Sequence, residues 1–163
     1  MKLNNLLRLK GFSVVILIAI FSIFATSCEK HPHSHEEHFE PVGIVVKDAT
    51  KGIFMKIFEG KIDTNYNKEV VLNFDELKDS ESDEYEIEFL GKDGKEIANP
   101  TSSSYKLELV FADKTIAELY QHDGEQWAFH IKALKKGETT FEIKVLHAGH
   151  SDFKTPSIKL NIK

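Results

Sequence analysis

The sequence predicts an all-β sandwich for the part of the chain from residue 42 to residue 163. Three observations support this fold class: short segments alternate apolar and polar residues, turn-forming residues separate them about every ten residues, and no long segment has helical periodicity. A domain of about 120 residues buries roughly two-thirds of the surface of its unfolded chain. Because Cys28 is the only cysteine, we expect the core alone, without disulfides, to hold the fold.

Nine strands are expected. Each is a short run rich in apolar, β-branched or aromatic residues, and glycine-containing turns such as those at Gly52, Gly94 and Gly124 lie between them. In chain order the expected strands are Val42–Lys47, Ile53–Glu59, Glu69–Phe74, Tyr85–Leu90, Tyr105–Phe111, Ile116–Gln121, Gln126–Leu134, Thr139–His147 and Pro156–Ile162.

The strands on either side of Asp123-Gly124-Glu125 are expected to form a hairpin with these three residues as its loop. In this register His122 and His130 point outward, and His130 lies opposite Glu118, with which it can pair across the strands. The two histidines are then about 13 Å apart, too far to share one metal ion. The apolar residues expected on the core face of the hairpin are Ala117, Leu119, Trp127, Phe129 and Ile131.

Residues 75–84 are strongly acidic, with six Asp or Glu side chains in ten residues. A calcium-binding loop of the EF-hand type requires the order Asp-x-Asp-x-Asp-Gly, which this segment lacks. We therefore expect a solvated acidic loop here.

The first 27 residues have the pattern of a secretory signal. Met1–Lys10 is basic, and Gly11–Ala25 is apolar but too short to span a bilayer of about 30 Å. A single-pass membrane anchor is the alternative interpretation. The run Ala25-Thr26-Ser27-Cys28 resembles the lipobox of bacterial lipoproteins. The resemblance implies that residues 1–27 are a cleaved signal peptide and that Cys28 becomes the diacylated N-terminus of the mature protein.

Lipidation of Cys28 places the protein in the cell envelope. Two or three acyl chains on one residue anchor a protein stably to a membrane, whereas one chain is marginal. We expect a lipid-anchored protein, on the outer membrane and facing either the periplasm or the cell surface. Lipidation also accounts for a lone cysteine in a secreted chain.

Residues 28–41 are the expected tether between this anchor and the sandwich. They contain four histidines and four glutamates and almost nothing to bury, so we expect a flexible segment. Imidazole is the commonest metal-binding side chain, and a short histidine-rich tract is typical of binding sites for zinc, nickel or copper. The alternative is a hydrophilic spacer. The candidate metal ligands of the tether are His31, His33, His35 and His38.

Four segments in the second half of the chain form a recurring pattern: an Ile-Ala pair, a turn, an apolar alternation and a Gly before a Thr-rich strand. The segments are Tyr105–Phe111, Asp113–Leu119, Trp127–Ala133 and Lys136–Ile143. They resemble the C to F strands of bacterial immunoglobulin-like domains of the second group. The resemblance implies an immunoglobulin-like β-sandwich with a binding or spacer role and without catalysis.

The strand order of that fold implies a metal site at one pole of the sandwich. The loop at residues 122–126 and the loop after His147 then lie at the same pole, so His122, His147 and His150 are expected to converge within about 5 Å. The alternative is that these histidines are solvated side chains in the loops of the sandwich and bind no metal. The candidate oxygen donors are Asp152, Asp123 and Asp93, and His130 is a further candidate ligand.

The expected function is capture of a divalent transition metal, zinc in preference, for buffering or for transfer to a membrane transporter. Zinc is preferred over copper because the chain offers few soft sulfur ligands, and binding should weaken as the pH falls through about 6.5, where imidazole is protonated. The alternative is a metal-independent module that binds another envelope protein or a glycan. Beyond Ser27 the chain has 18 basic and 26 acidic residues, which excludes a nucleic-acid partner. The sequence shows no pair of a catalytic base and a nucleophile, so we expect no enzymatic activity.

Overall fold

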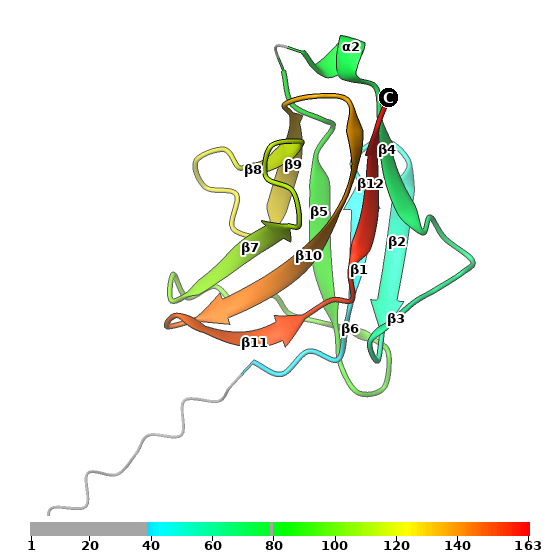
Figure 1. Ribbon diagram of the computed structural model, residues 1–163. Coiled ribbons are helices and arrows are strands. Elements are labelled where there is room, and N and C mark those ends of the chain that lie inside the picture. Colours follow the sequence, from blue (N-terminus) through cyan, green and yellow to red (C-terminus); the bar gives the residue numbers. More distant parts are fainter. Residues whose placement is uncertain (1–38, 79) are drawn as a thin grey trace, which may run out of the picture. The chain divides into compact units, whose positions relative to one another are not determined.

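The computed structural model describes residues 39–78 and 80–163, which form two β-sheets packed face to face (Figure 1). The predicted all-β sandwich is confirmed. The predicted signal peptide, the lipidation of Cys28 and the histidines of the tether lie outside the described residues. Within those residues, no helix is long and apolar enough to cross a membrane.

The first sheet is antiparallel, and β1 and β5 lie at its centre. β1 pairs with β2 on one side and with β5 on the other, and β5 also pairs with β6 and β9. In spatial order its strands are β3 (Lys61–Ile62), β2 (Gly52–Phe58), β1 (Gly43–Asp48), β5 (Tyr85–Leu90), β9 (Ala128–Ala133) and β8 (Ala117–Tyr120), with β6 (Glu96–Ile97) beside β5.

The second sheet is built around β10, a strand of eleven residues. The first half of β10 pairs with β12, its second half pairs with β11, and β7 pairs along its other side. β4 lies parallel to β12 at the end of the sheet. The strands are β11 (His150–Lys154), β10 (Gly137–His147), β12 (Ile158–Ile162), β4 (Glu69–Leu72) and β7 (Tyr105–Phe111).

The core lies between the two sheets and follows the alternation of the sequence. Along β7, for example, every second residue from Tyr105 to Phe111 is buried. Trp127 is buried, and its indole N–H donates to the carbonyl oxygen of Pro100 at 2.8 Å, so its polar atom is satisfied. The predicted core face of the hairpin is confirmed, with four of its five residues buried and Leu119 partly buried.

Strand boundaries differ from the prediction where local hydrogen bonds decide them. β4 ends at Leu72 because the Asn73 side chain accepts from the Asp75 N–H at 3.1 Å and caps the short helix α2 (Phe74–Leu77). β11 was not predicted, because its sequence is polar and only pairing with β10 holds it in a strand. β5 and β7 have the predicted bounds.

The packed chain includes Phe39, which precedes the first strand. The Phe39 ring packs edge-on against Phe89, with centroids 4.8 Å apart, and against Tyr105 at 5.9 Å. Its N–H donates to the Tyr105 hydroxyl oxygen at 3.3 Å. Residues before the predicted start at Val42 therefore contribute to the core.

Candidate metal centre

The candidate site is built on the hairpin of β8 and β9. The ladder of this hairpin ends with Tyr120 opposite His130, and Glu118 faces Lys132, so the predicted pairing of His130 with Glu118 is wrong. The loop comprises residues 121–127 rather than three residues, because the two strands separate after Tyr120.

The longer loop folds back on itself. A turn brings the Glu125 N–H to the His122 carbonyl oxygen at 3.1 Å, and Gly124 within it has a φ of +93°, which favours glycine. The His122 N–H in turn donates to Glu125 Oε2 at 2.8 Å. The Gln121 amide donates to the carbonyl oxygens of Glu125 and Ala128 at 3.0 and 2.8 Å and fixes the loop against β9.

The loop and β9 together bring three potential ligands close to one another. His122, Glu125 and His130 each offer an atom, and these atoms all lie within 4.8 Å of one another. His130 Nε2 is 3.7 Å from Glu125 Oε2, and the two imidazole rings meet edge to face with centroids 4.9 Å apart. The predicted separation of about 13 Å between the histidines was wrong, because it assumed that both strands remain straight as far as residue 122.

His130 is buried rather than directed outward, with 8% of its surface exposed. Its Nδ1 lies 2.8 Å from the carbonyl oxygen of Ser82. A carbonyl only accepts, so Nδ1 carries the hydrogen and the neutral ring has its lone pair on Nε2. Among the residues that the structure describes, the buried Nε2 has no hydrogen-bond partner. A carbonyl that fixes one ring nitrogen while the other is left to a metal is the usual arrangement of a metal-binding histidine.

Glu125 is held in its charged form. The main cause is the hydrogen bond from the His122 backbone N–H, which lowers the pKa of the Glu125 carboxyl below its ordinary value. Desolvation opposes the shift, while the neighbouring His122 and His130 lower this pKa further. A carboxylate is therefore available as a ligand over the pH range in which histidine is neutral.

The donor set suits a borderline divalent cation. Two atoms bound to one tetrahedral zinc ion at about 2.0–2.1 Å lie about 3.3 Å apart. The 3.7 Å between His130 Nε2 and Glu125 Oε2 is longer than a hydrogen bond and close to that separation. Two imidazoles and one carboxylate are also a ligand set common for zinc.

The other predicted ligands lie elsewhere. His147 is buried at the end of β10, where its ring stacks on Tyr105 at 4.1 Å and its Nδ1 lies 3.5 Å from Asp152 Oδ2. His150 faces His147 across the β10–β11 ladder and is exposed. Asp123 is exposed in the turn. Among the described residues only His122, Glu125 and His130 form a three-ligand group, so the expected convergence of His122 with His147 and His150 is not found.

Sequence reasoning placed Glu125 in the loop but not among the ligands. The available signal was the spacing His122-x-x-Glu125, since a turn brings residues three apart together. Ser82, which orients His130 from 48 positions away along the chain, had no local signal.

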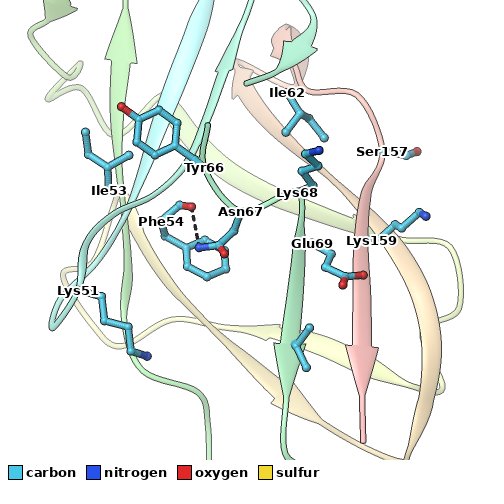
Figure 2. A pocket seen from close by; sticks show the side chains of 11 residues that line it. Lys51, Ile53, Phe54, Ile62, Tyr66, Asn67, Lys68, Glu69, Ser157 and Lys159 are labelled. Atoms are coloured by element: carbon cyan, nitrogen blue, oxygen red, sulfur yellow. Dashed lines mark hydrogen bonds between the residues drawn. The ribbon is translucent and has the colours of Figure 1, made fainter. Parts of the chain in front are cut away.

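A second feature is a groove of about 980 Å³, lined by residues of β2, β3, β4 and β12 and of the chain between β3 and β4 (Figure 2). The Asn67 amide donates to the Phe54 carbonyl oxygen at 3.0 Å and ties this connection to β2. Ile53 and Val71 are large apolar residues that line the groove and are more than 40% exposed. Its basic residues are Lys51, Lys68 and Lys159.

No protein-family model matches this chain, and no curated protein matches it at a significant level.

Proposed function

We propose that this protein is a lipid-anchored protein of the cell envelope that binds a divalent transition-metal ion, zinc in preference, at His122, Glu125 and His130. Buffering of the ion, or its transfer to a membrane transporter, is the proposed role. The lipobox-like run ending at Cys28 supports the location, and the histidine-rich segment after it supports a role in collecting metal.

One observation carries the proposal. His130 Nε2 is buried and without a hydrogen bond, and it points toward a second imidazole and a charged carboxylate. An unsatisfied buried acceptor costs about 1–3 kcal/mol. A bound cation removes this cost and neutralises the carboxylate at the same time.

The test is a zinc titration by calorimetry near neutral pH. Residues 29–163 with Cys28 removed should bind zinc, and so should a form that begins at Phe39, because the three ligands lie within the sandwich. His122→Gln should weaken binding by the sandwich form at least about tenfold, as expected for loss of a ligand. His122 is preferred for substitution because its side chain is 45% exposed and its loss should not disturb the core.

His150→Gln is the matched control, since His150 is exposed and outside the three-ligand group. It should bind zinc as the unchanged protein does. Binding that disappears with residues 29–38 would assign the metal to the tether and refute a site in the sandwich. Equal losses in the two variants would also refute the assignment.

The groove favours a second candidate function, a metal-independent interaction module. Within residues 39–78 and 80–163, β4 pairs only with β12, so the backbone along its other side can accept an added strand. An acidic, extended segment of another envelope protein would match the three lysines and the exposed Ile53 and Val71. Absence of zinc binding in both forms of the protein would favour this alternative.

A further inference from the structure

The acidic segment before β5 approaches the candidate metal centre. Glu81 Oε1 lies 3.6 Å from His122 Nε2, and the Glu81 side chain is 34% exposed. This distance is again longer than a hydrogen bond and close to the separation of two ligands on one zinc ion. Glu81 thus reaches His122 from a part of the chain 41 positions before it, although it lies outside the three-ligand group itself.

Ser82 fixes the position of Glu81. The Ser82 N–H donates to the Ile131 carbonyl oxygen at 3.0 Å, and its hydroxyl oxygen accepts from the Ile131 N–H at 2.9 Å. Its carbonyl oxygen accepts from His130 at 2.8 Å. Because Ser82 is buried and bonded to β9 at three points, the residue before it is held beside His122 rather than left in a free loop.

The acidic segment also makes the site more negative than three ligands require. Glu81 Oε1 lies 3.6 Å from His122 Nε2, and Glu125 Oε2 lies 3.7 Å from His130 Nε2, so two carboxylates face the two imidazoles. Carboxylates that share one site repel one another unless a cation lies between them. The charge of the site therefore favours a divalent ion with more than one carboxylate ligand.

We propose that Glu81 is the fourth ligand of the metal centre and closes it as a site of two histidines and two glutamates. This inference rests on the proposed metal-binding function. Four protein ligands leave no open position for water or substrate, which is the pattern of metal sites that hold an ion rather than catalyse hydrolysis. The bound ion then joins three segments: residues 81–84, the loop 121–127 and β9.

The test compares Glu81→Gln with Glu76→Gln in the protein beginning at Phe39. Glu76 is a matched control because it belongs to the same acidic run but is exposed in α2. Zinc affinity is measured by competition with a chromophoric chelator. E81Q should bind zinc at least about tenfold more weakly than the unchanged protein, and E76Q should bind it equally well.

Cobalt(II) absorption supplies a second measurement, since four-coordinate cobalt absorbs visible light much more strongly than six-coordinate cobalt. The unchanged protein and E76Q should give the same intense spectrum, and E81Q should give a shifted spectrum as water replaces the Glu81 carboxylate. Equal zinc affinity and equal cobalt spectra in all three proteins would overturn the role of Glu81 while leaving the three-ligand site intact. Absence of metal binding in the unchanged protein would instead overturn the proposed function itself.

Discussion

Asp48 shows how a turn can stabilise a buried charge. It lies at the end of β1 with 3% of its surface exposed, and its Oδ1 accepts from the N–H and the hydroxyl of Thr50 at 2.9 and 2.7 Å. Burial is the largest single influence on the pKa of this carboxyl and raises it. The hydrogen bonds from Thr50, with the charge of Lys51, together outweigh burial and hold the pKa below its ordinary value.

Asp48→Asn is expected to reduce stability most at neutral pH. The folded pKa lies below the unfolded value of about 3.9, so the charged form stabilises the fold above that value and the contribution is lost as the pH falls through the folded pKa. D48N should lower the free energy of unfolding by about 1–2 kcal/mol near neutral pH. The difference in unfolding free energy between D48N and the unchanged protein should narrow in strong acid. Urea unfolding near neutral pH and in strong acid measures this difference.

Asp123→Asn is the control for this substitution, because Asp123 is an exposed aspartate in a turn. It should leave the stability unchanged at both pH values. A gap between D48N and the unchanged protein that stays constant with pH would show that charge has no part in the effect.

The position of His130 could not be predicted from alternation. Its place in β9 correctly puts it on the face opposite the core residues Phe129 and Ile131. That face is nevertheless covered, because Ser82 bonds to β9 and the loop 121–127 folds back over it. Neither the contact with Ser82 nor the folded-back loop follows from the alternation of residues along β9, and Ser82 is also distant in sequence. Alternation alone therefore predicts that His130 is exposed, whereas the structure has it buried.

At the scale of elements, the turn between β10 and β11 holds an unfavourable residue. Ala148 and Gly149 form this turn with φ values of +48° and +89°. Two positive φ angles in a two-residue hairpin loop are typical of a type I′ turn, for which Asn-Gly is the preferred sequence. Alanine pays a steric cost in this region that glycine does not.

Ala148→Asn should therefore stabilise the protein. Asparagine tolerates the left-handed conformation, and we expect a gain of about 0.5–1 kcal/mol in the free energy of unfolding. Residue 148 is exposed, so the larger side chain can extend into solvent. Thermal and urea unfolding measure the gain.

Ala112→Asn serves as the comparison for this prediction, because Ala112 is also exposed but lies outside the residues with positive φ. It should give no gain. A148N with unchanged or lower stability would show that the turn does not strain Ala148.

The sequence predicted best those strands whose bounds are determined by the alternation of apolar and polar residues alone. β5 and β7 alternate apolar and polar residues along almost their whole length and have the predicted bounds. The strands that were missed depend on their partners: β3 and β6 have two residues each, and β11 is polar. Their sequences carry no period, so only the neighbouring strand makes them extended.

For the whole molecule, the sandwich holds together through its core and through aromatic contacts between the sheets. Within the first sheet, Phe89 of β5 packs edge-on against Trp127, which precedes β9, with centroids 4.9 Å apart. Tyr105 of β7, in the other sheet, meets Phe39, which also packs on Phe89. Phe39 therefore links the two sheets although it belongs to neither.

Removal of Phe39 tests whether the sandwich depends on this link. A form that begins at Val42 loses the ring contacts with Phe89 and Tyr105 and the hydrogen bond to the Tyr105 hydroxyl. We expect it to be less stable than the form that begins at Phe39 by about 1–3 kcal/mol, since the ring is only partly buried.

Urea unfolding of three forms separates the contribution of Phe39 from that of the tether. Residues 29–163 and 39–163 should unfold at the same urea concentration, because the link between the sheets is present in both. Phe39→Ala in the longer form should reproduce most of the loss seen when the chain begins at Val42. A Val42 form as stable as the other two would mean that the sheets pack equally well without Phe39, and that the domain begins where the first predicted strand does.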